Sequence, residues 1–168
     1  MEKMEALRQY FGFSSFREGQ QTLIDAVLAG RDVLGVMPTG GGKSLCYELP
    51  ALLLPGLTLV ISPLISLMKD QVMALQNAGI PAGCIHSAMS VEELREAYRD
   101  TRFGAYKILY IAPERLLTDG FCALAQELEI SLLAVDEAHC ISQWGQDFRP
   151  SYLKILDFLQ KLPRRPAL

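Results

Sequence analysis

The sequence predicts a three-layer α/β domain with a central parallel sheet, and three observations lead to this prediction. Five short apolar runs alternate along the chain with longer segments in which apolar residues have helical spacing. The short runs are apolar almost throughout, which is typical of parallel strands that helices cover on both faces. Polar, acidic or glycine-rich segments follow several of these runs, so we expect a ligand site beyond the carboxyl ends of the strands.

The predicted elements follow one another in a regular order. Apolar spacing predicts a helix from Glu2 to Phe11 and a second helix that begins at Gln20. The predicted strands are Asp32–Val36, Leu57–Ser62, Gly83–His86, Lys107–Ala112 and Ser131–Asp136. Between them we expect helices at about Lys43–Leu54, Leu64–Asn77, Val91–Arg102 and Phe121–Glu129. A last helix begins near Pro150 and leads into residues 162–168, which resemble a loop before another strand, so we expect the chain to stop short of a complete protein.

Length and composition describe one ordinary globular domain. The chain has 168 residues, of which 50% are hydrophobic and 21% are charged, and this is enough to form a core. Its longest apolar run, Leu49 to Ile61, is interrupted by Pro50 and Pro55 and is too short to span a bilayer. No basic segment followed by an apolar one opens the chain. We therefore expect no membrane partner and a cytoplasmic location.

Net charge bears on nucleic-acid binding, and cysteine spacing bears on zinc sites and disulfides. A net charge of −3 provides no overall positive charge for binding nucleic acid, although binding depends on where the charge lies. The four cysteines stand far apart without a Cys-x-x-Cys pair. Buried reduced thiols are therefore favoured over a zinc site or a disulfide framework.

The prediction of function begins at residues 37–44, which read Met-Pro-Thr-Gly-Gly-Gly-Lys-Ser between a predicted strand and a predicted helix. The three glycines allow backbone conformations in which N–H groups, together with the positive end of the helix, cradle phosphate oxygens. Lys43 would reach the β- and γ-phosphates of ATP, and the Ser44 hydroxyl would ligate Mg²⁺. The strict P-loop pattern has glycine where Met37 stands, so this is a variant of it. The alternative is a glycine-rich turn without a ligand.

A second motif stands at the end of the last predicted strand, where Asp136 and Glu137 are adjacent. Neighbouring residues on a strand point to opposite faces, so the two acids could perform different tasks. Asp136 is placed to hold Mg²⁺, and Glu137 could polarise the water that attacks a phosphoryl group. The alternative is a pair of acids that merely ends a strand.

With these motifs, the chain resembles the first RecA-like domain of a superfamily 2 helicase, and more narrowly the RecQ family of ATP-dependent 3'-to-5' DNA helicases. The resemblance runs from about Leu7 to the C-terminus. It is carried by residues 16–20, 37–47, 62–71, 110–116 and 136–145. The last of these, Asp-Glu-Ala-His-Cys-Ile-Ser-Gln-Trp-Gly, is followed by Asp-Phe-Arg-Pro at 147–150 and is the most specific.

The resemblance implies roles for the residues that match the family's nucleotide motifs. Adenine recognition would fall to Phe13, Arg17 and Gln20. Metal binding and water activation would fall to Asp136 and Glu137. The phosphate motif comprises Thr39, Gly40, Gly41, Gly42, Lys43 and Ser44. Taken alone, Phe11, Phe13 and Phe16 could equally form a hydrophobic plug between helices.

The resemblance also implies contacts with DNA, either single-stranded or as a duplex with a 3' tail. The segments that would contact single-stranded DNA include Ser62, Pro63, Ser66 and Arg115. An aromatic-rich loop that would couple DNA binding to hydrolysis includes Trp144, Phe148 and Arg149. Core packing is the alternative for Trp144, and helix capping is the alternative for the segments that begin at Ser62 and Ala112.

The family's remaining parts are expected outside these residues. A Thr-Ala-Thr or Ser-Ala-Thr motif should follow just beyond Leu168, with a second RecA-like domain that brings an arginine finger. We expect the parent protein to be a monomer and the present chain to have little activity alone. Two rival functions stay open, an RNA helicase of the Asp-Glu-Ala-His type and a non-catalytic nucleotide-binding module.

Overall fold

The centre of the molecule is a parallel sheet of four strands within the residues that the computed structural model describes, which are 1–38, 42–141 and 149–168. The spatial order of the strands is β2-β3-β1-β4. Their bounds are β1 (Leu57–Ile61), β2 (Ala82–Ile85), β3 (Ile108–Ile111) and β4 (Ile130–Val135). All residues of β1 and β3 are buried, which explains why these runs are apolar throughout.

Helices connect the strands in the order that the sequence predicts. They are α1 (Lys3–Phe11), α2 (Gln20–Leu28), α3 (Leu45–Leu53), α4 (Ile65–Asn77), α5 (Val91–Arg102), α6 (Asp119–Ala125) and α7 (Ile155–Lys161). Short 3₁₀ segments η1 (Pro113–Arg115), η2 (Ala138–Ile141) and η3 (Pro150–Lys154) join them. The predicted bounds of α5 are confirmed, because the Ser90 hydroxyl accepts the N–H of Glu93 and so caps its first turn.

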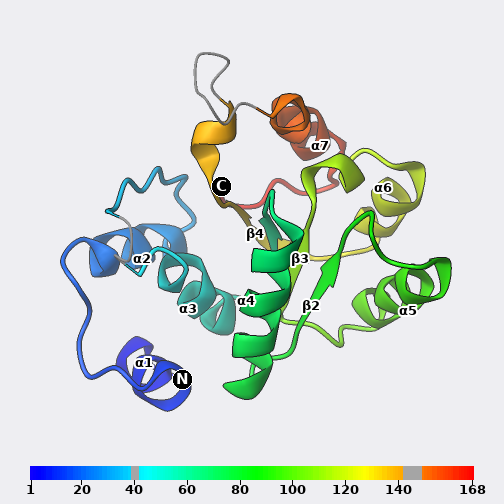
Figure 1. The fold of residues 1–168 in the computed structure, drawn as a ribbon. Coiled ribbons are helices and arrows are strands. Elements are labelled where there is room, and N and C mark those ends of the chain that lie inside the picture. Colours follow the sequence, from blue (N-terminus) through cyan, green and yellow to red (C-terminus); the bar gives the residue numbers. More distant parts are fainter. Residues whose placement is uncertain (39–41, 142–148) are drawn as a thin grey trace.

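Helices cover both faces of the sheet, which confirms the three-layer prediction (Figure 1). On one face, side chains of α5, α6 and α7 pack against β1, β3 and β4, with Phe121 and Phe158 stacked at the centre. On the other face α3 and α4 pack against the sheet, and α1 and α2 form a further cluster with α3. Apolar burial on both faces supplies the main stabilisation of such a domain.

The predicted strand Asp32–Val36 is wrong, because the structure has no strand there. A strand needs a neighbour to complete its backbone hydrogen bonds, and the backbone of this segment bonds to the last residue of the chain instead of to a strand of the sheet. The N–H of Val33 donates to the carbonyl of Leu168 (2.8 Å), while the adjacent Ala167 pairs with Leu132 of β4. Leu34 and Val36 are consequently 80% and 90% exposed.

An ion pair fixes this arrangement of the two distant segments. The Arg165 guanidinium lies 2.7 Å from the Asp32 carboxylate, which also accepts the N–H of Leu168 (3.1 Å). Asp32 therefore belongs to a contact between chain segments and not to a strand of the sheet.

Two expectations from composition can be compared with the structure. All four cysteines are free thiols, of which Cys140 is buried and Cys46, Cys84 and Cys122 are half-buried. In the part of the chain that the structure describes, no helix is both long and apolar enough to cross a membrane.

The turn between α3 and β1 depends on Gly56, which has a φ of +68°. A Cβ at this position would collide with the main-chain oxygen of Glu129. That oxygen accepts the N–H of Leu57 (2.8 Å), a hydrogen bond that starts the contact of β1 with β4. The close approach of the two backbones therefore requires glycine here.

Replacing Gly56 by alanine should lower the free energy of unfolding by roughly 3 kcal/mol, from the left-handed conformation and from the collision together. Urea denaturation followed by circular dichroism measures the loss. Gly79→Ala is the matched control, because Gly79 has a φ of +82° and open space around a Cβ. The control should lose only about 1–2 kcal/mol. Equal losses in the two variants would show that the approach to Glu129 has no energetic consequence.

Candidate functional site

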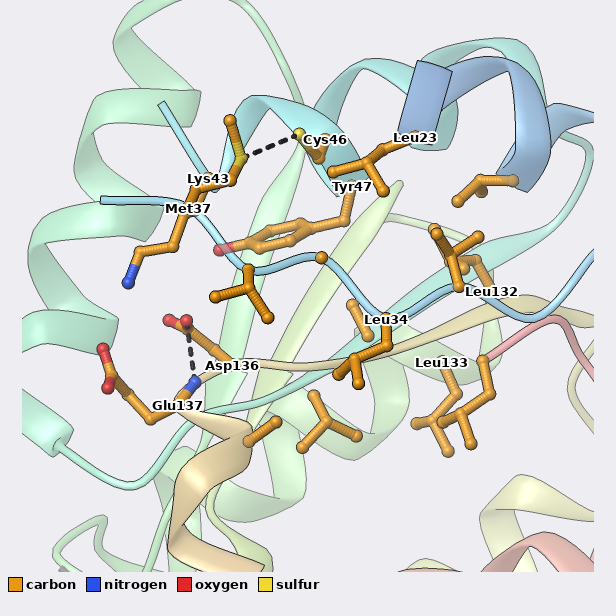
Figure 2. A pocket seen from close by; sticks show the side chains of 18 of the residues that line it. Leu23, Leu34, Met37, Lys43, Cys46, Tyr47, Leu132, Leu133, Asp136 and Glu137 are labelled. Carbon is orange, nitrogen blue, oxygen red and sulfur yellow. Dashed lines mark hydrogen bonds between the residues drawn. The ribbon is translucent and has the colours of Figure 1, made fainter. Parts of the chain in front are cut away.

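The candidate site is a cavity of about 520 Å³ between the start of α3, the segment 33–37 and the end of β4. Figure 2 shows that its two ends differ. The Lys43 amine and the carboxylates of Asp136 and Glu137 lie at one end, and leucines from the segment 33–37 and from β4 lie at the other. The structure therefore brings Lys43 together with the two acids, which stand 93 and 94 residues later in the sequence.

The backbone places Asp136 and Glu137 by a sharp change of direction. The N–H of Asp136 donates to the carbonyl of Ile61 (2.9 Å) and so continues the β1–β4 ladder by one residue. Glu137 then has a φ of +55°, the left-handed region, which no other non-glycine residue among those described adopts. Its N–H donates to Asp136 Oδ1 (3.0 Å). Such conformations persist only where the surrounding structure enforces them, and they are frequent at functional sites.

This turn corrects the expectation that the two acids point to opposite faces of a strand. Strand β4 ends at Val135, and the left-handed residue that follows Asp136 breaks the alternation. Both carboxylates line the same cavity (Figure 2). If Asp136 holds Mg²⁺ and Glu137 polarises water, this difference must therefore come from their positions within one site.

Burial and like charge act together on Asp136. Burial raises the pKa of the Asp136 carboxyl above its ordinary value, and the negative charge of Glu137 raises it further, while the N–H of Glu137 and the charge of Lys43 partly offset these effects. The Nδ1 atom of His139 lies 3.3 Å from Glu137 Oε2, so this histidine bonds within the site. A cation near the two acids would relieve their repulsion.

The donor atoms fit a hard divalent cation such as Mg²⁺. The Asp136 carboxylate lines the cavity and Ser44 lines the neighbouring pocket, and carboxylate and hydroxyl oxygens are ligands that suit Mg²⁺. Among the described residues no group of three or more His, Cys, Asp or Glu side chains could hold a metal ion alone. The set thus fits Mg²⁺ that takes its remaining ligands from substrate phosphates and water.

The described part of the phosphate loop comprises Gly42, Lys43 and Ser44, and the predicted residues Thr39, Gly40 and Gly41 lie outside the described ranges. Gly42 has a φ of +74°, and a Cβ on it would collide with Nε2 of Gln20. Glycine suits position 42 for two reasons, because it adopts the positive φ and because it leaves space for the Gln20 amide. The Ser44 carbonyl accepts N–H groups of the first turn of α3, so Lys43 and Ser44 stand at the helix N-terminus.

A second pocket of about 410 Å³ lies beside the loop, and its lining includes Phe13, Arg17, Gln20, Gly42 and Ser44. Gln20 is 3% exposed, and its amide joins two segments. Its Oε1 accepts the N–H of Arg17 (2.8 Å) and its Nε2 donates to the carbonyl of Gly42 (3.0 Å). The predicted adenine motif is thus hydrogen-bonded to the phosphate loop, while pairing of Gln20 with adenine stays a prediction.

The three phenylalanines near this pocket behave differently. Phe11 and Phe16 are partly buried against the cluster formed by α1, α2 and α3, as the hydrophobic-plug interpretation expects. Phe13 is 51% exposed and lines the pocket. All three line the pocket, and of the three Phe13 is the most exposed, as a stacking residue would be.

The residues predicted to contact DNA do not form one accessible set. Ser62 is 1% exposed, so its side chain is not accessible in this structure. Pro63 is half-buried, Ser66 is exposed, and Arg115 Nη2 donates to the hydroxyl of Tyr98 (3.2 Å). Arg149 is half-buried.

Two predicted residues of the coupling loop, Trp144 and Phe148, lie outside the described ranges. The alternatives that the sequence leaves for Trp144, stacking platform or core residue, therefore stay open.

A buried polar cluster beside the site was not predicted. Glu48 of α3 is 7% exposed, and the hydroxyl of Tyr110 lies 3.4 Å from its Oε1 and 3.3 Å from Oε1 of Gln71 on α4. The hydroxyls of Tyr47 and Tyr110 are 3.2 Å apart. Burial raises the pKa of Glu48 to about 7, against the effect of the Tyr110 hydrogen bond, and Asp136 adds to the rise. The one signal in the sequence is an acidic residue between Leu45 and Leu49 of an otherwise apolar helix.

Comparisons with known proteins point to one family. The family model described as DEAD/DEAH box helicase matches residues 17–167. The chain is 51% identical over 163 residues to the ATP-dependent DNA helicase RecQ of Bacillus subtilis and 47% identical over 165 residues to that of Haemophilus influenzae. These matches cover 96% and 98% of the chain but only 28% and 27% of the relatives.

A solved structure shares the fold. The structure of a hypothetical ATP-dependent RNA helicase from Sulfolobus tokodaii superposes with a TM-score of 0.73 at 25% identity, over 98% of this chain and 48% of that one.

The burial of Glu48 predicts a pH dependence of stability. Its pKa is about 7 in the folded chain against an ordinary value of 4.5, so between these values the folded state holds a proton that the unfolded state releases. Its contribution to the free energy of unfolding is therefore lost as pH rises through this window, by about 3 kcal/mol in total.

Glu48→Gln removes the ionisable group and keeps the shape, so the variant should gain stability relative to the unchanged protein from pH 4.5 to pH 8. Urea denaturation at several pH values measures the difference. Glu96→Gln, on the exposed face of α5, is the control and should follow the unchanged protein. A pH-independent difference for Glu48→Gln would mean that the pKa of Glu48 is the same in the folded and unfolded chains.

Proposed function

Because this chain belongs to the DEAD/DEAH box helicase family, within its RecQ group, we propose that it forms the ATP-binding half of a 3'-to-5' DNA helicase. The observation that carries the proposal is the meeting of Lys43, Asp136 and Glu137 at one end of a cavity beside the pocket of Phe13 and Gln20. The chain spans about a quarter of the length of its curated relatives. The complete activity is therefore proposed for a longer protein, in which a second RecA-like domain closes the cleft.

Lys43 and the N-terminal end of α3 would bind the phosphates of ATP. The loop N–H groups and the helix terminus attract anions, and Lys43 is exposed to the cavity. Phe13 would stack on the adenine, while Gln20 keeps the adenine pocket and the phosphate loop in register through Gly42. Base and phosphates would thus bind on two sides of one loop.

Asp136 and Ser44 would hold Mg²⁺, which supplies charge neutralisation at the β- and γ-phosphates when bound. Glu137 would orient and polarise the water that attacks the γ-phosphorus, with His139 at 3.3 Å as its partner. Catalysis of this kind is mostly positioning and charge stabilisation. An arginine finger from the second domain would contribute roughly three to five orders of magnitude in rate.

The chain is more similar to proteins named DNA helicases than to one named an RNA helicase, and this favours DNA as the nucleic acid. Identity reaches 47–51% with proteins named DNA helicases, against 25% with the protein named an RNA helicase. Single-stranded DNA, or a duplex with a 3' tail, would cross the carboxyl ends of the strands near Pro63 and Ser66.

In the protein that contains this chain together with its second domain, Lys43→Ala should abolish ATP-driven strand separation, because Lys43 binds phosphate in the ground state. Glu137→Gln should keep nucleotide affinity within about twofold and lower kcat by at least about 100-fold, since general-base catalysis contributes factors of this size. The measurements are nucleotide affinity by calorimetry and ATPase rate with single-stranded DNA. Hydrolysis by Glu137→Gln at the unchanged rate would require another base.

The 168-residue chain alone should bind ATP or ADP weakly in the presence of Mg²⁺ and hydrolyse almost none. The reason is that the proposed arginine finger is contributed by another domain. Calorimetric titration and a phosphate-release assay with and without DNA test both parts. DNA-stimulated turnover of about 1 s⁻¹ or more, which is typical of working enzymes, would contradict the proposal of a half-site.

A further inference from the structure

Tyr152 connects η3 to the catalytic end of β4. Its side chain is 1% exposed and packs in the core on the α5–α7 face of the sheet. Its hydroxyl donates a hydrogen bond to the main-chain carbonyl of Asp136 (3.0 Å). None of the sequence motifs includes this residue.

The carbonyl that Tyr152 binds belongs to the peptide between Asp136 and Glu137. The N–H of the same peptide donates to Asp136 Oδ1 (3.0 Å), so both polar atoms of this peptide group have partners. Glu137, directly after it, has the left-handed φ of +55°. Rotation of this peptide would break both hydrogen bonds and turn the Glu137 side chain away from its place in the cavity. A residue in such a conformation keeps it only where its surroundings enforce it.

We propose that Tyr152 is a positioning residue for ATP hydrolysis, whose hydroxyl holds the Asp136–Glu137 peptide in the orientation that directs the Glu137 carboxylate toward the phosphate end of the cavity. This inference rests on the proposed function, because it takes Glu137 as the group that activates water. Burial raises the pKa of Tyr152 well above its usual range, so the phenol stays protonated and able to donate.

A second hydrogen bond ties the same two segments together. The N–H of Arg149 donates to the carbonyl of Cys140 (2.9 Å), and the N–H of Tyr152 donates to the carbonyl of Arg149 (3.0 Å). The segment 149–152 is therefore clamped to the segment 136–140 at two places. A displacement of Arg149 would be transmitted to the Asp136 carbonyl through the Tyr152 ring, which the core holds.

The test is Tyr152→Phe in the protein that contains both domains, because this change keeps the buried ring and removes only the hydroxyl. Loss of one hydrogen bond to the site should lower kcat about five- to tenfold. The KM for ATP and the affinity for ADP should stay close to those of the unchanged protein, and the melting temperature should fall by only a few degrees, because one carbonyl loses its partner. Tyr106→Phe is the matched control, because it also removes a hydroxyl donor, to Asp100 (3.3 Å), at the opposite end of the strands, and kcat should not change.

A double-mutant cycle with Glu137→Gln separates positioning from general loss of structure. If Tyr152 acts through Glu137, adding Tyr152→Phe to Glu137→Gln should cause no further fall in kcat. A fall in that background equal to the fall in the unchanged protein would overturn the proposal, because Tyr152 would then act elsewhere.

Amide hydrogen exchange of the nucleotide-free protein provides a readout besides activity. Tyr152→Phe should speed exchange of the Glu137 and Cys140 amides about five- to tenfold and leave β1 and β3 unchanged. Unchanged exchange at these two amides overturns the proposal, whatever the activity. If the unchanged protein hydrolyses no ATP, the proposed function fails. If it hydrolyses ATP and Tyr152→Phe matches it in kcat, the positioning role fails.

Discussion

The hydrogen-bond ladder between β1 and β4 determines where the chemistry of this domain lies. It begins at the close approach of Leu57 to Glu129 and ends where the N–H of Asp136 donates to Ile61. Because both strands are parallel and buried, their carboxyl ends meet at one edge of the sheet. The acid that follows β4 is therefore fixed by backbone geometry, and Lys43 reaches the same cavity from the N-terminus of α3.

Local patterns in the sequence were sufficient for most of the fold and for the meeting of Lys43 with the acid pair, because strand periodicity and motif chemistry depend on neighbouring residues. The features that the sequence predicted wrongly or did not predict depend on contacts between distant segments. Apolar content predicts a strand at Asp32–Val36, yet the backbone and the Asp32 carboxylate of this segment bond to residues 165–168 and complete no ladder. The burial of Glu48, the left-handed turn at Glu137 and the bond from Tyr152 likewise arise from residues that are far apart in the chain.

Gln20 shows how the two halves of the predicted nucleotide site depend on one another. Its buried amide spans from Arg17 to Gly42, so the position of the adenine pocket and the conformation of the phosphate loop are not independent. The absence of a Cβ at Gly42 creates the space for this amide. A glycine that the phosphate motif explains by backbone conformation is thus also required by a residue that lies 22 positions earlier.

The charges around the cavity explain why half of the cleft is insufficient for hydrolysis under the proposed function. Among the described residues that line it, Lys43 and His139 are the basic groups, and they face two acids. A triphosphate brings more negative charge than Lys43 and a helix terminus balance, and the acids add to the repulsion. Mg²⁺ would reduce this charge in the ground state, but charge that develops on the γ-phosphoryl group in the transition state requires a further cation. Under the proposed function, this chain would therefore bind the nucleotide and activate the water, and a residue from another domain would stabilise the transition state.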